Sequence, residues 1–139
     1  MAHMLKVLAA AGFVAAMAQP VLAVDGTVEA GKKVFVKCAV CHGIGDTKKP
    51  IGPNLNNVIG RTAGTQEEFL AKGKQGYSEA MIAAGAGGLV WDETQIAEYV
   101  ADPKKKVPGN KMVFPGLKKE QEIADVIAYV KSFSTAPAQ

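Results

Sequence analysis

The chain has 139 residues, about the size of one domain. Its 16 basic and 13 acidic residues give a formal net charge of +3, which excludes the strongly basic composition expected of a nucleic-acid-binding domain. Only two cysteines and two histidines are present, so any site that binds metal must be assembled from very few side chains.

The N-terminal stretch has the features of a secretory signal peptide. Lys6 provides a positive charge, residues 5–18 are apolar, and Val21-Leu22-Ala23 forms a small-residue cleavage site. The alternative is that residues 5–24 stay on as a membrane anchor. Gln19, Pro20 and the cleavage pattern favour removal.

The predicted signal peptide sets the expected domain boundaries. Residues 1–3 precede a second methionine, Met4, and are interpreted as a remnant of an expression vector. We therefore expect residues 1–23 to be this remnant and a cleaved signal peptide, and residues 24–139 to be one domain. Export predicts that this domain works in the periplasm, an oxidising compartment.

The first predicted element after the signal is a helix over residues 25–37. Thr27 can cap it, and Val28, Val34 and Phe35 return at helical spacing. Residues 43–64 are rich in Gly, Pro and Asn, which predicts a loop.

Short helices are predicted next. Possible starts lie at Thr65, with Glu68, and at Ser78-Glu79, while Gly73 and Gly85 are plausible stops. Asp92 and Gln95 resemble a capping box for a further helix, which must end near Asp102 because Pro103 follows. Ile96, Tyr99 and Val100 give that helix one buried face.

The C-terminal part is predicted as a loop over residues 104–115 and a final helix over residues 120–133. The helix carries one apolar stripe, formed by Ile123, Val126, Ile127, Val130 and Phe133. No stretch alternates with the period of a strand, so we expect an all-α domain of four to five helices. Its long loops contribute little packing, and a large apolar cofactor would supply the missing core.

Residues 38–42 read Cys-Ala-Val-Cys-His, the C-x-x-C-H pattern of c-type haem attachment. Residues three apart on a helical turn point the same way, so Cys38 and Cys41 can each add to a vinyl group on one porphyrin edge. His42 can then bind the iron through one nitrogen while the other donates to a carbonyl. We therefore expect one covalently bound haem c.

Other uses of the two cysteines fit the sequence less well. A thioredoxin-type disulfide needs a βαβ setting, whereas the pattern here is helical. A zinc site needs about four ligands, and residues 24–139 offer two cysteines and one histidine. A chance match of the motif is the third alternative.

Several side chains are candidates for the sixth iron ligand. No second histidine follows residue 23, which leaves Met81, Met112, a lysine or an open position. Met112 lies in the Pro/Gly-rich segment 108–116, where a loop can direct its side chain inward. Met81 lies in a short helical pattern, and a core position explains it better.

Further motifs accompany the cysteine pair in a characteristic order. They are residues 28–35, Cys38 to His42, Gly52-Pro53-Asn54-Leu55, Gly60-Arg61, Trp91, and Tyr99 through Met112 with Pro103-Lys104-Lys105 and Pro108-Gly109. Together they resemble the class I cytochromes c, the mitochondrial and bacterial cytochrome c2 group, over nearly all of residues 24–139. The resemblance implies the class I cytochrome c fold, with helices and long loops wrapped around one haem c.

The resemblance also implies a ligand set. Cys38 and Cys41 would form the thioethers, and His42 and Met112 would be the axial ligands of the iron. The carbonyl of Pro53 would accept the imidazole proton of His42.

Other matching residues would surround the haem. Tyr99 would lie near the Met112 sulfur. Gly31 and Phe35 would pack the first helix against the last, around Tyr129. The residues expected near the haem propionates are Arg61, Tyr77, Trp91 and Asn110.

Iron with two protein ligands has no open position for substrate or oxygen, and His/Met ligation raises the reduction potential. We therefore expect a soluble mono-haem electron carrier, not an enzyme, that passes one electron at a time between redox complexes of a chain such as a respiratory chain. A five-coordinate haem enzyme or sensor is the alternative, and it would need Met112 to be unbound. A thiol–disulfide protein is the third possibility.

Lysines are concentrated in segments expected to border the haem edge. They are Lys37, Lys104, Lys105, Lys106, Lys111, Lys118 and Lys119. Such a face would steer membrane or periplasmic redox proteins that carry acidic patches. We expect no nucleic-acid partner, and we expect a monomer.

Overall fold

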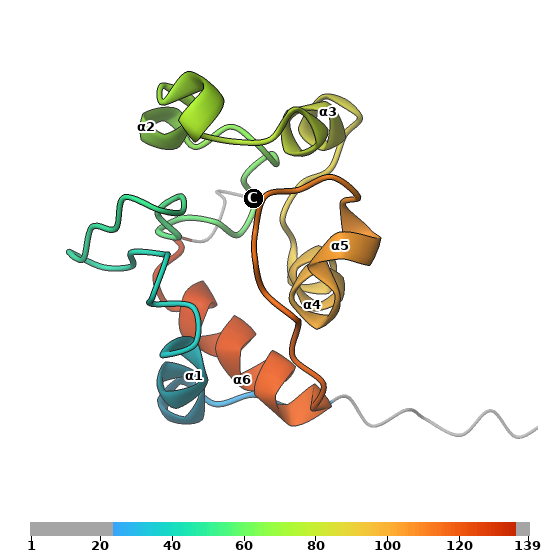
Figure 1. The fold of residues 1–139 in the computed structure, drawn as a ribbon. Coiled ribbons are helices and arrows are strands. Elements are labelled where there is room, and N and C mark those ends of the chain that lie inside the picture. The colour runs from blue at the N-terminus through green and yellow to red at the C-terminus, as the bar shows by residue number, and fades with distance from the viewer. Residues whose placement is uncertain (1–23, 136–139) are drawn as a thin grey trace, which may run out of the picture.

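The computed structural model describes residues 24–135, so the predicted signal peptide and vector remnant lie outside the described residues. Helix α1 (Val28–Phe35) packs against α6 (Glu120–Lys131), and α4 (Glu93–Ala101) contacts both α6 and α5 (Pro103–Lys106). Figure 1 shows α2 (Glu67–Leu70) and α3 (Glu79–Ala86) at the other end of the molecule from α1. A 3-10 turn, η1 (Gly73–Gln75), follows α2.

The all-α prediction is confirmed. Within residues 24–135 the β pairing is limited to one isolated antiparallel bridge between Thr62 and Val90. No helix in this part of the chain combines the length and apolar character that a membrane span requires.

The close crossing of α1 and α6 depends on a glycine. A Cβ at Gly31 would lie 1.9 Å from the backbone oxygen of Asp125, so a larger residue would push the two helices apart. The Asp125 side chain accepts the Thr27 N–H at 2.8 Å and fixes the start of α1 against α6. The rings of Phe35 and Tyr129 lie 5.2 Å apart, so the predicted packing of Gly31 and Phe35 around Tyr129 is confirmed.

Helix ends differ from the prediction at several places. Helix α1 covers residues 28–35 rather than 25–37, and the chain continues as turns toward the cysteines. Gln66, not Thr65, caps α2 by accepting the Phe69 N–H at 2.8 Å, and α2 ends before Gly73 is reached. Helix α6 ends at Lys131, two positions short of the predicted end.

The prediction of a loop from residue 104 is wrong at its beginning. Pro103 ends α4, as expected, but it also opens the short helix α5. Proline suits the first turn of a helix because its missing N–H has no helical partner there. The Asp102 side chain caps this turn by accepting the Lys105 N–H at 3.1 Å.

The prediction that Gly85 ends its helix is also wrong, because α3 continues to Ala86 and stops at Gly87. A Cβ at Gly85 would lie 1.9 Å from the backbone oxygen of Ala63. Gly85 therefore allows α3 to approach the chain near Ala63, and it does not serve as a terminator.

Candidate functional site

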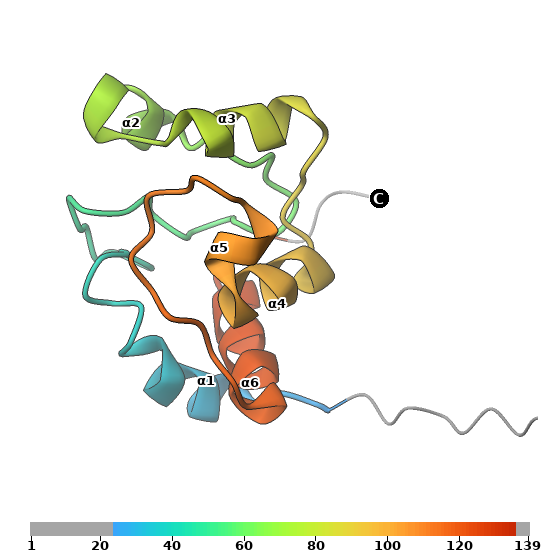
Figure 2. The ribbon, with the colours of Figure 1, turned by 45° about the vertical axis from the view of Figure 1, so that its right-hand side comes forward.

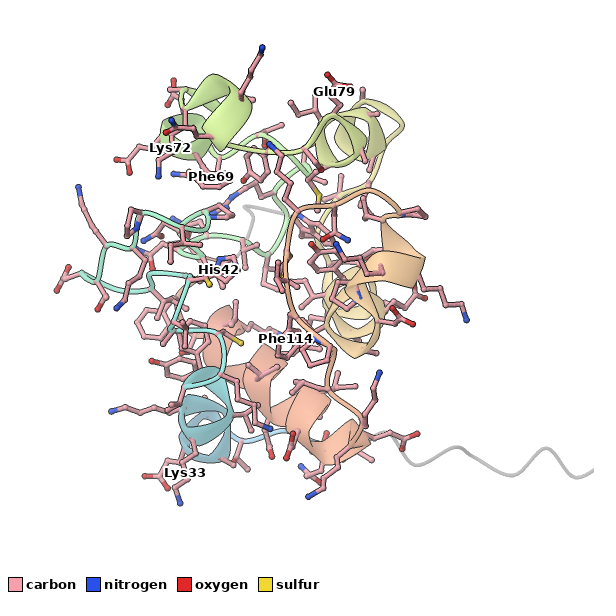
Figure 3. The ribbon with its side chains drawn as sticks, viewed as in Figure 1. Lys33, His42, Phe69, Lys72, Glu79 and Phe114 are labelled. Atoms are coloured by element: carbon pink, nitrogen blue, oxygen red, sulfur yellow. The ribbon has the colours of Figure 1, made fainter. Side chains whose placement is uncertain are left out.

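A cavity of about 330 Å³ lies between the helices and the long loops. Its volume falls in the range of about 300–1,000 Å³ that is typical of cofactor pockets. Figure 3 shows His42, Phe69 and Phe114 arranged around it. The apolar walls come from segments far apart in the sequence, namely Phe35, Leu55, Val58, Phe69, Trp91, Ile96, Val100, Phe114, Val126 and Val130.

Cys38, Cys41 and His42 all line this cavity. The turn after α1 positions them, since the N–H groups of Cys41 and His42 both donate to the Cys38 carbonyl, at 3.0 and 2.9 Å. Both thiols are free of disulfides in the described chain. Burial raises the pKa of the Cys38 thiol to about 11. A raised pKa disfavours a reactive thiolate at Cys38.

The His42 ring is held in the orientation that a metal ligand needs. Its Nδ1 lies 2.8 Å from the carbonyl oxygen of Pro53, as predicted. Burial lowers the pKa of His42, and the Pro53 carbonyl partly opposes this effect. A neutral imidazole that donates from Nδ1 keeps the lone pair of Nε2 for a metal.

Met112 also lines the cavity, and the neighbouring Asn110 organises its segment. The Asn110 amide nitrogen donates to the carbonyls of Pro103 and Val107, at 2.7 and 2.8 Å. Its amide oxygen accepts the Met112 N–H at 2.9 Å. Asn110 thus anchors the Met112 loop through both amide N–H groups and its amide oxygen. It also lines the cavity, and its place near a haem propionate stays a prediction.

A second methionine reaches the same cavity. Met81 projects from α3 and is 7% exposed. Its N–H is capped by the Ser78 hydroxyl at 3.1 Å, so its backbone is fixed. The packing against the core matches the expected core position, and experiments on the sixth ligand need to include both methionines.

Arg61 and Tyr77, two of the residues predicted near the haem propionates, lie at a polar part of the cavity wall. Arg61 donates from Nη1 to the Asn54 carbonyl at 2.9 Å and from Nη2 to the Asn56 carbonyl. Burial lowers the pKa of Arg61 and raises that of Tyr77, and the proximity of the two side chains opposes both shifts. Arg61 thus keeps a charged guanidinium at the cavity, with further N–H groups able to hold a carboxylate.

Trp91 and Tyr99 form an aromatic pair in the wall, with ring centroids 4.9 Å apart. Burial raises the pKa of the Tyr99 hydroxyl. Tyr99 and Met112 line the same cavity, in keeping with the expected proximity of the phenol to the sulfur.

Five of the cavity-lining residues are exposed to solvent, and we call them the mouth residues. They are Lys37, Ile51, Gln75, Lys111 and Val113. Ile51 is 64% and Val113 is 96% exposed, so apolar surface meets solvent here. Two lysines flank it, and the mouth residues include no carboxylate.

Two lysines of the predicted face, Lys37 and Lys111, line the cavity. The Lys104 ammonium donates to the carbonyl of the cavity-lining Asn110 at 2.7 Å, and Lys105, Lys106, Lys118 and Lys119 are not among the lining residues. Lys37 also forms an ion pair with Glu122 at 2.7 Å. Lys72, which donates to the Pro50 carbonyl at 2.6 Å, was not predicted to have a role. No sequence signal reveals such a contact, because its partner lies 22 positions away.

Known proteins match the chain over most of its length. The cytochrome c family model matches residues 28–134. A cytochrome c2 of Agrobacterium tumefaciens (strain II Chrys) is 42% identical over 117 residues, which cover 83% of this chain and 100% of that protein. A cytochrome c2 of Afifella marina is 45% identical over 109 residues, covering 78% of this chain and 83% of that protein. The solved structure of cytochrome c2 from Rhodobacter sphaeroides matches with a TM-score of 0.70 and 39% identity, covering 81% of this chain and 100% of that one.

The cavity suits a haem group for reasons of its own chemistry. Two thiols can form thioethers, a neutral imidazole offers Nε2, apolar side chains can cover the ring, and the Arg61 guanidinium can meet a propionate. The chain belongs to the cytochrome c family, in the class I cytochrome c2 group, and carries one covalently attached haem c with its iron.

Proposed function

We propose that this electron carrier passes single electrons between redox complexes of the periplasm, with the iron held by His42 and Met112. One observation carries the proposal: both side chains line one cavity, the His42 ring lies in hydrogen-bond contact with the Pro53 carbonyl, and the Met112 backbone N–H donates to the Asn110 side chain. The haem supplies one-electron chemistry between ferrous and ferric iron. The periplasmic site of action depends on the signal peptide predicted in residues 1–23.

The protein orients the His42 ligand and excludes water from the surroundings of the cavity. Pro53 fixes the His42 ring and makes Nε2 more basic. Buried apolar side chains such as Val58, Phe69 and Trp91 keep the surroundings of the cavity at low dielectric, which favours the less charged ferrous state. Iron closed by two protein ligands favours electron transfer over catalysis at the metal.

Visible spectra of the oxidised and dithionite-reduced holoprotein test the ligand set. The wild type is expected to be low-spin, with the weak near-infrared charge-transfer band of a methionine–ferric-iron bond. Met112→Ala should abolish this band, and Met81→Leu, which keeps an apolar side chain in the same cavity, should leave it in place. Loss of the band in Met81→Leu alone would reassign the ligand to Met81. A high-spin wild type would instead support an enzyme or sensor with open iron.

The proposal includes a docking face centred on the mouth residues. Electrons leave a haem most readily where the ring comes nearest to the partner, and the mouth is where the cavity reaches solvent. Ile51 and Val113 offer apolar contact there, while Lys37 and Lys111 favour an acidic redox partner. The lysines of the predicted face that do not line the cavity would add long-range attraction.

A further inference from the structure

The segment that bears Met112 has little backbone support. Figure 2 shows it arching from α5 toward α2 and back to α6. Between Asn110, whose N–H donates to the Val107 carbonyl, and Leu117, whose N–H donates to the Val100 carbonyl, the described chain forms no backbone–backbone hydrogen bond. The position of Met112 must therefore depend on side chains.

The two residues just before Met112, Asn110 and Lys111, provide such side chains. The Lys111 ammonium lies 2.8 Å from the Lys74 carbonyl oxygen, 3.4 Å from that of Gly76 and 3.3 Å from that of Tyr77. Three backbone carbonyls more than 30 positions earlier in the chain thus converge on one cation. Hydrogen bonds with a charged donor are stronger than neutral ones, so this contact holds the segment on its exposed side.

These carbonyls belong to residues 66–77, which contain α2 and η1 and which we call the strap. The strap closes one wall of the cavity through Phe69 and Tyr77, whose rings pack edge-to-face with centroids 4.9 Å apart. Lys72 fixes its outer side, because the ammonium donates to the Pro50 carbonyl and lies 5.0 Å from the Phe69 ring centroid. Figure 3 shows Phe69 on α2 and Lys72 just after it, above the loop that carries His42.

Two lysines therefore connect three segments that meet at the cavity. Lys111 ties the Met112 segment to the strap, and Lys72 ties the strap to the loop at Pro50, three positions before the Pro53 carbonyl that orients His42. We infer that Lys111 is a positioning residue for the sixth ligand, which keeps Met112 at the cavity through the strap, with Lys72 as the second anchor. The inference depends on the proposed ligand role of Met112.

Imidazole competition in the ferric holoprotein tests this inference. At saturating imidazole, the rate of ligand replacement is limited by opening of the Met112 segment. Lys111→Met keeps the chain length and removes the donor, so the limiting rate should rise about five- to tenfold. Lys72→Met should raise it about twofold. Lys111→Arg keeps a charged donor and should restore a rate close to that of the wild type.

Lys105→Met is the matched control, because Lys105 is exposed and its side chain forms no described hydrogen bond or ion pair. It removes the same charge and should leave the rate and the methionine–iron band unchanged. Equal rates in Lys105→Met and Lys111→Met, or a failure of Lys111→Arg to restore the rate, would overturn the positioning role. A wild type without the methionine–iron band would instead overturn the ligand assignment itself, so the two failures are distinguishable.

Discussion

At the scale of single residues, the Asn110 side chain supplies hydrogen bonds that the backbone supplies in helices and sheets. It is 4% exposed, and it serves as donor to two carbonyls and as acceptor for the Met112 N–H. A buried polar group that loses its partner costs about 1–3 kcal/mol. The amide therefore couples the folding of α5 to the position of Met112.

Asn110→Asp is expected to lower the free energy of unfolding by about 2–4 kcal/mol. The carboxylate keeps the acceptor for Met112, but it cannot donate to the Pro103 and Val107 carbonyls and it faces them with negative charge. Denaturant titration of the holoprotein measures the change. Asn57→Asp is the control, because Asn57 uses only its oxygen, toward Thr135, and should change stability by less than about 0.5 kcal/mol. Equal effects at the two positions would contradict the argument.

At the scale of elements, capping residues in the sequence indicate where several helices begin, whereas packing against other segments decides where α3 ends. Thr27, Ser78 and Asp92 cap helices as side-chain acceptors, as their residue types predict. Gly85 has the residue type of a terminator, yet α3 continues through it because the helix needs a residue without Cβ beside Ala63. Residue type alone does not separate these two uses of glycine.

Gly85→Ala is expected to destabilise the protein by about 1–3 kcal/mol, since the new Cβ would force α3 away from the Ala63 carbonyl. Gly87→Ala is the matched control. A Cβ at Gly87 would meet only the carbonyls of Ala83 and Ala84, at 3.3 and 3.4 Å, and its backbone has a negative φ. That variant should stay within about 0.5 kcal/mol of the wild type in thermal unfolding. A Gly85→Ala variant as stable as Gly87→Ala would rule out the close approach.

At the scale of the whole molecule, the formal net charge of +3 matters less than its distribution. The mouth residues carry two lysines and no carboxylate, although Lys37 is paired with Glu122 at 2.7 Å. Lysines elsewhere also pair with acids, such as Lys131 with Glu93 at 2.5 Å. Charge close to the site of electron exchange controls the encounter rate, because attraction is screened over a Debye length of about 8 Å at physiological salt.

Substitutions at Gln75 test this charge distribution without breaking a described side-chain contact. Oxidation of the reduced holoprotein by anionic hexacyanoferrate(III) should slow about two- to threefold in Gln75→Glu and accelerate by a similar factor in Gln75→Lys at low salt. The cationic oxidant tris(1,10-phenanthroline)cobalt(III) should give the reverse order. Lys33→Gln changes the net charge as Gln75→Glu does, but Figure 3 shows Lys33 on α1, at the opposite end of the molecule from α2. An equal effect of Lys33→Gln would mean that net charge alone controls the rate.

The sequence by itself determined the features that depend on neighbouring residues. These include the cysteine pair with His42, the caps at Thr27, Ser78 and Asp92, the apolar stripe of α6 and the all-α class, because helical spacing and turn chemistry act over a few positions. The His42–Pro53 contact followed from the family resemblance and needs only 11 positions. Each of these features depends on residues within one short segment of the chain.

Only the tertiary structure decided which distant groups meet. Three contacts correspond to no periodic pattern in the sequence. They are the hydrogen bonds of both Asn110 amide N–H groups within its own loop, the convergence of three carbonyls on Lys111, and the contact of Lys72 with Pro50. The same holds for the mouth residues, which come from four separate segments and share only the cavity. The physical reason is that hydrogen bonds and burial between remote residues arise after the chain closes around its core, and local propensity carries no information about them.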